Sequence, residues 1–190
     1  MSTQQSKPLS KEEKQEERKY IACILTALGL IVGYVLVYFI GRVICLGWPW
    51  EVYSWRWWLH HSSPTSFSYL YGWLIHGNLF WLVPIITVIV AVLGKYKFSL
   101  SCFAGFVVGL VVGELFGKNP AGAERGLTHY GWEIWLLILL FSAFMGIILE
   151  KLFKKESFSW RSKRFWIWCA VFVLGIVAIV LLVRANMWHP

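Results

Sequence analysis

Five stretches of the chain are continuously apolar, and each is about as long as a membrane-spanning helix. They cover approximately residues 20–41, 69–93, 98–117, 130–153 and 165–183. A helix needs about 20 apolar residues to cross roughly 30 Å of hydrocarbon, and a single segment in lipid must satisfy its own backbone polar groups. The runs lack the alternation typical of barrel strands. The pattern therefore predicts an all-α, polytopic integral membrane helix bundle with five transmembrane helices.

The polar segments at the two ends complete the predicted organisation. Residues 1–19 form a charged tail, in which Ser10 and Glu13 have the spacing of a capping box and predict a short surface helix before the first span. We expect residues 20–184 to form a single transmembrane domain and residues 185–190 a short tail on the other side.

The first loop, residues 42–68, is too rich in tryptophan for a segment exposed to water. Five tryptophans lie between Trp48 and Trp58. Amphipathic rings of this kind collect at the boundary between membrane and water. The loop is therefore predicted to be an interfacial helix or a re-entrant segment.

The composition agrees with a membrane protein and excludes several chemistries. Apolar residues make up 58% of the chain and charged residues 15%, against about 45–50% and about 25% in soluble domains. The sequence contains no aspartate, which excludes aspartyl proteases and aspartyl-phosphate enzymes. Four scattered cysteines without a CxxC pair are expected to pack as small apolar side chains: Cys23, Cys45, Cys102 and Cys169.

The basic residues predict the orientation of the chain. With the N-terminus in the cytoplasm, 13 of the 18 lysines and arginines fall on the inner side and 5 on the outer side. The positive-inside rule then predicts the N-terminus inside and the C-terminus outside. Because the net charge of +8 comes mostly from residues that flank apolar segments, it indicates topology, and no nucleic-acid partner is expected. We expect a multi-pass protein of the cell membrane, and the short loops favour a bacterial inner membrane.

Glycines recur at every fourth position in the third apolar segment. Small residues at this spacing let two helices approach closely in lipid, where dispersion contacts hold them together. The stripe predicts a tightly packed central helix, with the first segment as one candidate neighbour, although a homodimer seam or room for a ligand would need the same residues. The predicted packing glycines are Gly29, Gly33, Gly105, Gly109, Gly113 and Gly117.

Glu114 is the only acid inside that third segment. It lies near the C-terminus of the predicted helix, where the helix dipole disfavours an anion. Acids within spans tend to face the bundle interior or a wet cavity. The alternative is a carboxylate that reaches the head-group region beside Lys118, four residues later.

Two further polar groups of residues lie toward the predicted outer side. His129 and Glu133 have i, i+4 spacing at the start of the fourth segment, which suits two ligands of one metal or an acid–base pair, but also an interfacial histidine and a carboxylate at the positive end of its helix. His76 and Asn78 lie within the second segment, where each needs a hydrogen-bond partner. That partner could be a ligand or a neighbouring helix.

These residues support three hypotheses of function. We favour binding or transport of a small amphipathic molecule, a lipid head group or a cation in an outward-facing polar pocket. The alternatives are a membrane-embedded metal-dependent enzyme and a non-catalytic accessory subunit. A divalent metal on His129 and Glu133 is the one cofactor considered, and the lipid bilayer, a second copy or another membrane subunit are the possible partners. The predicted pocket residues are His76, Asn78, Glu114, His129 and Glu133.

Overall fold

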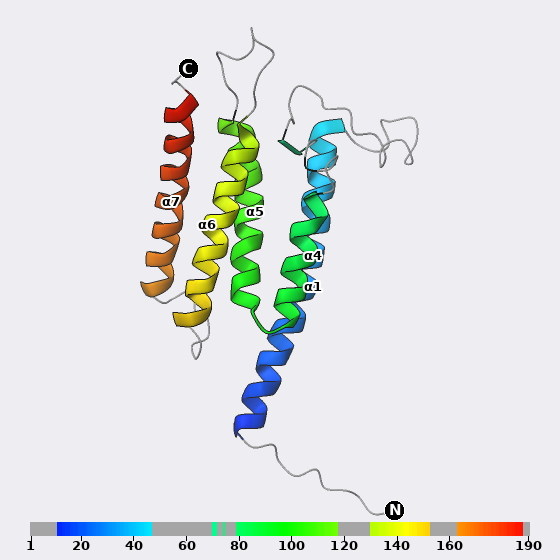
Figure 1. Cartoon of the computed structure of the whole chain (residues 1–190). Coiled ribbons are helices and arrows are strands. Elements are labelled where there is room, and N and C mark those ends of the chain that lie inside the picture. The colour runs from blue at the N-terminus through cyan, green and yellow to red at the C-terminus, as the bar shows by residue number, and fades with distance from the viewer. Residues whose placement is uncertain are drawn as a thin grey trace, which may run out of the picture.

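The computed structural model describes residues 11–46, 70–71, 74, 79–117, 130–152 and 163–187 (Figure 1). Within these ranges the protein is all-helical, as predicted, with five helices and no strand. The helices are α1 (Lys11–Leu46), α4 (Leu79–Val92), α5 (Tyr96–Phe116), α6 (Gly131–Leu152) and α7 (Lys163–Met187).

Four of these helices are long and apolar enough to cross a membrane. The qualifying spans are Glu13–Ile44, Tyr96–Phe116, Gly131–Leu152 and Trp166–Ala185. The fifth apolar helix, Phe80–Val92, is shorter, although Leu70, Tyr71 and Leu74 before it are also helical. The chain is therefore a membrane protein. The predicted tryptophan-rich segment and the Ser10 cap lie outside the described residues.

The charged tail and the first span form one continuous helix. The sequence predicts a short surface helix that leads into the first span, and in the structure α1 runs through both for 36 residues, or about 54 Å at 1.5 Å per residue. Lysine, glutamate and glutamine are good helix formers, and no glycine or proline separates them from the apolar run. The N-terminal part of α1 consequently projects beyond the other helices (Figure 1).

The helices form a row in which α5 is central. α4 packs against both α1 and α5, α5 packs against α6, and α6 against α7 (Figure 1). A tight turn joins α4 to α5 and contains Gly94 at φ 90°, a conformation that glycine adopts without strain. In the spanning part of α5 39% of the residues are buried, against 6% in α7. α7 is thus the peripheral helix, and most of its surface is left for lipid.

The glycine stripe of α5 faces α6. A Cβ atom on Gly105 would overlap the side chain of Ser142, and one on Gly113 would lie 2.6 Å from the carbonyl oxygen of Gly131. Gly109 faces the same helix. The close neighbour of the stripe is therefore α6, whereas the sequence pattern had suggested the first segment. The sequence could not distinguish the two neighbours because both are apolar.

The remaining packing glycines have different surroundings. A Cβ on Gly117 would overlap the backbone of Gly131, so the stripe continues to the end of α5. Gly33 faces the ring of Phe103, which is a side-chain contact between α1 and α5. Gly29 has no neighbouring atom within 4 Å, so it makes no close approach to the described residues.

Aromatic rings fill the core between α1, α4, α5 and α6. Phe106 is fully buried at its centre and makes edge-to-face contacts with Tyr34, Phe80 and Trp135 at centroid distances of 5.2, 5.3 and 5.8 Å. Such ring pairs stabilise packing beyond their buried area. This cluster fixes α5 against its neighbours along the middle of the bundle.

Candidate functional site

The structure describes two of the five residues of the predicted outer pocket. Glu114 and Glu133 are both half-buried, whereas His76, Asn78 and His129 lie outside the described residues. In the part of the chain that the structure describes, no three histidines, cysteines or acids lie close enough to hold a metal ion. The convergence of these five residues and the metal site therefore stay predictions.

Glu114 holds the second apolar segment against α5. Its Oε1 atom accepts hydrogen bonds from the backbone N–H groups of Leu70, at 2.8 Å, and Tyr71, at 3.0 Å. Two successive N–H groups that donate to a side chain are typical of the first turn of a helix. These two N–H groups give Glu114, which lies near the C-terminus of its own helix, donors from outside that helix. The alternative partner, Lys118, lies outside the described residues.

Glu150 repeats this arrangement at the other end of α5. Its Oε1 atom accepts from the backbone N–H groups of Lys97, at 2.8 Å, and Phe98, at 3.3 Å. The residue before α5, Lys95, makes no side-chain capping bond. Glu150 is the third residue from the end of α6, as Glu114 is of α5. Each of these carboxylates thus accepts two successive backbone N–H groups from another segment, and Glu150 caps the start of α5.

A hydrogen-bonded group that the sequence analysis missed lies near Glu114. Arg42 is only 4% exposed, its Nε donates to the hydroxyl of Tyr38 at 3.0 Å, and its guanidinium lies 5.3 Å from the centre of that ring. The hydroxyl of Tyr71 donates to the carbonyl of Tyr38. These bonds join α1 to the segment that Glu114 caps. In the sequence, this contact is indicated by the i, i+4 spacing of Tyr38 and Arg42, which places both side chains on one face of a helix.

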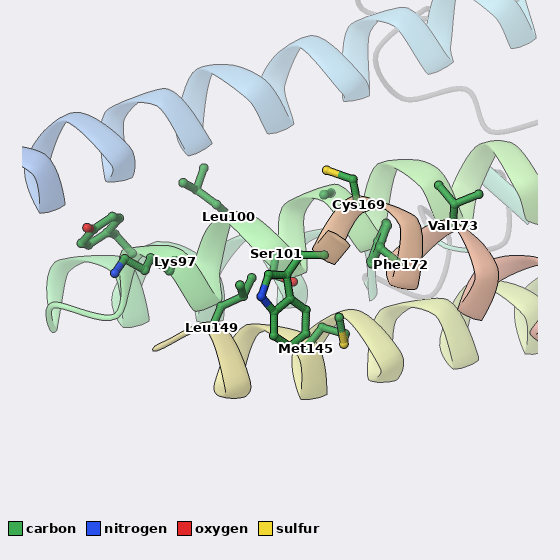
Figure 2. Close-up of a pocket in the computed structure, with 11 residues that line it drawn as sticks. Lys97, Leu100, Ser101, Met145, Leu149, Cys169, Phe172 and Val173 are labelled. Atoms are coloured by element: carbon green, nitrogen blue, oxygen red, sulfur yellow. The ribbon is translucent and has the colours of Figure 1, made fainter. Parts of the chain in front are cut away.

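A space for a ligand lies elsewhere among the described residues, at the end of the bundle where α5 begins. A cavity of about 390 Å³ lies between α5, α6 and α7 (Figure 2). Its α5 wall consists of Tyr96 and of the four residues Lys97, Leu100, Ser101 and Ala104. The spacing i, i+3, i+4, i+7 places these four residues on one face of the helix, next to the face that carries the glycines.

Phe172 of α7 stacks on Phe141 of α6, and the second half of α7 packs further along α6. There, Ile176, Ile179 and Val180 pack against Ile134 and Ile138 of α6. The first half of α7 instead lines the cavity, through Trp168, Cys169, Phe172 and Val173. α6 contributes Met145 and Leu149. The cavity is therefore lined by three helices, with the first half of α7 as one wall.

The wall of the cavity is apolar apart from one charged side chain. The hydroxyl of Ser101 donates to the carbonyl of Ser142 at 2.7 Å, so it serves the α5–α6 contact. Lys97 is only 6% exposed, and its Nζ atom lies 5.7 Å from the ring centre of Tyr96. Figure 2 shows Lys97 at one end of the cavity and Val173 at the other. In the sequence, Lys97 indicates topology. Its position also continues the row formed by Leu100, Ser101 and Ala104 on α5.

Lysines gather around the end of the bundle that contains this cavity. We call it the basic end, defined by the side chains of Lys95, Lys97, Lys151 and Lys163. Each lies on or next to a helix that lines the cavity, and all except Lys97 are exposed. Glu150 is the one acid with a described side chain on these three helices at this end. Among the described side chains of α5, α6 and α7, lysines therefore outnumber acids at the end of the bundle where the cavity lies.

No family model, curated protein or solved structure matches the chain.

Proposed function

We propose that this membrane protein binds a lipid-like amphipathic molecule in the cavity between α5, α6 and α7. The observation that supports the proposal is an apolar wall with one buried lysine at its end. Ligand sites are typically cavities of about 300–1,000 Å³ that are mostly apolar with a few placed polar groups. The volume of about 390 Å³ falls in this range.

The position of the cavity also favours a ligand that arrives from the bilayer. Leu100 and Val173, on opposite walls, are 47% and 57% exposed on the apolar surface of the bundle. An acyl chain could enter between them without crossing water. A second cavity of about 270 Å³, which Tyr34, Trp81 and Pro84 help to line, contains no charged residue in its wall. It offers nothing to recognise a polar head group, so we place the ligand between α5, α6 and α7.

Filling the cavity is expected to remove the bound ligand. Ala104 lines the α5 wall and is exposed, so an indole at this position would occupy the space without displacing a core side chain. We expect Ala104→Trp to lower the amount of co-purified lipid at least tenfold, measured by native mass spectrometry of protein released from a mild detergent. The melting temperature should remain close to that of the wild type.

Ala178→Trp provides the matched control. Ala178 is exposed on the part of α7 beyond the cavity, so the same indole there should leave lipid retention unchanged. Equal retention by the wild type and both variants would contradict the proposed site. Equal loss in both variants would indicate a general effect on annular lipid and would also contradict it.

A further inference from the structure

We infer that the ligand is an anionic phospholipid, with its phosphate beside Lys97 and an acyl chain along the stripe from Leu100 to Ala104. This inference rests on the proposed function, because it names the chemical class of the molecule in the same cavity. The observation behind it is that one wall of the cavity contains both Lys97, which is more than nine-tenths buried, and a row of apolar side chains.

The geometry of α5 matches the shape of such a lipid. Lys97 lies at the second position of the helix, at the level where a membrane-spanning helix meets the head groups. Ala104 lies seven residues further on, or about 10 Å deeper at 1.5 Å per residue. A head group at Lys97 and a chain running toward Ala104 would each lie at their usual depth in a bilayer.

The charges around the cavity favour an anion over a neutral or cationic head group. Three further lysines, Lys95, Lys151 and Lys163, lie at the same end. Basic pockets between transmembrane helices are a recognised way to bind anionic lipid head groups. The carboxylate of Glu150 opposes an anion, but its Oε1 atom accepts from the backbone N–H groups of Lys97 and Phe98. Four lysines therefore share this end of the three helices with one glutamate, whose carboxylate caps α5.

The predicted orientation leads to the same ligand class. The positive-inside rule places the basic end at the cytoplasmic leaflet, which carries the negative surface charge of anionic lipids. The occupant to which we commit is therefore an anionic phospholipid of that leaflet, rather than a soluble phosphate compound.

The test compares two lipids that differ only in the head group. Wild-type protein in nanodiscs of phosphatidylcholine would be titrated with phosphatidylglycerol or with a spectroscopically distinct phosphatidylcholine of the same acyl chains. We expect the wild type to prefer phosphatidylglycerol at least fivefold, because one lysine near the surface contributes about that factor. Lys97→Gln should abolish most of this preference while it keeps binding of the acyl chain, and Lys97→Arg should retain it.

Lys95→Gln and inorganic phosphate are the controls. Lys95 is exposed and does not line the cavity, so its replacement should reduce the preference less than Lys97→Gln does. Millimolar inorganic phosphate should not displace the lipid; displacement would indicate a soluble anion as the ligand and overturn the inference. Because Lys97 is buried, the melting temperature of each variant would be recorded with the titration, and Lys97→Arg provides the test if Lys97→Gln does not fold.

Failure of the inference and failure of the proposed function give different results. An unchanged head-group preference in Lys97→Gln, together with loss of both lipids in Ala104→Trp, would overturn the anionic ligand and leave the lipid-binding cavity supported. Unchanged binding of both lipids in Ala104→Trp would overturn the cavity itself. A wild type with no preference would also overturn the anionic ligand.

Discussion

Gly113→Ala is expected to destabilise the protein strongly, whereas Gly29→Ala is expected to leave its stability unchanged or slightly raised. The added methyl group at position 113 would lie 2.6 Å from the backbone oxygen of Gly131 and 2.6 Å from Cδ2 of Leu70. The oxygen belongs to the backbone of α6, so only a separation of α5 from α6 relieves the overlap. Overpacking of this kind costs about 1–3 kcal/mol, and more where the backbone cannot move.

Gly29 is the matched control because it has no neighbouring atom within 4 Å. There, alanine adds helix propensity of up to about 1 kcal/mol and meets no clash. The stability of Gly33→Ala should lie between those of the other two variants. Its added methyl group would meet the ring of Phe103, a side chain that can rotate. The measurement is the melting temperature of the three purified variants in one detergent. Equal melting temperatures for Gly113→Ala and Gly29→Ala would contradict the close contact of α5 with α6.

Glu114→Ala and Glu150→Ala are each expected to destabilise the bundle by about 1–3 kcal/mol. Each substitution leaves two backbone N–H groups of a neighbouring helix without their carboxylate acceptor, and a hydrogen bond to a charged group contributes about 1.5–3 kcal/mol. Because glutamine keeps an acceptor oxygen, Glu114→Gln and Glu150→Gln should lose less stability than the alanine variants. The free energy of unfolding, measured by denaturant titration in mixed micelles, provides the comparison.

The double variant tests whether the two caps act independently. The capped position 97 and Glu114 are 17 positions apart on α5. This corresponds to about 26 Å along the helix. At this separation, the changes in the free energy of unfolding of the two single variants should add to within about 0.5 kcal/mol. Glu16→Ala is the control, because Glu16 is exposed on the projecting part of α1. If both single alanine variants were as stable as Glu16→Ala, the capping role of the two glutamates would be wrong.

The helical class and the membrane-spanning helices could be predicted from the sequence because both depend on local composition. A run of apolar residues forms a helix in lipid whichever neighbours it later meets. The length of α1 was underestimated, because the change from charged to apolar residues indicates a change of surroundings and not the end of a helix. The capping box of Ser10 and Glu13 stays a prediction, because Ser10 lies outside the described residues.

The contacts between helices could not be predicted from the same pattern. The spacing of Gly105 and Gly113 predicts a close neighbour, but any apolar helix could fill that place. The same holds for Glu114 and Glu150, whose acceptor role depends on which backbone N–H groups lie beside them. The cavity depends on how α5, α6 and α7 pack together, a property of three helices that no single segment encodes.

The central claim is that the cavity at the basic end binds a specific lipid rather than annular lipid. The most direct measurement is crosslinking of a photoactivatable anionic phospholipid, with the reactive group in its acyl chain, to the full-length protein in membranes, followed by peptide mapping. The account predicts adducts concentrated on Leu100, Ala104, Phe172 and Val173, and their loss in Ala104→Trp. Adducts spread evenly over the exposed apolar surface of α1 and α7, and unchanged by Ala104→Trp, would contradict it.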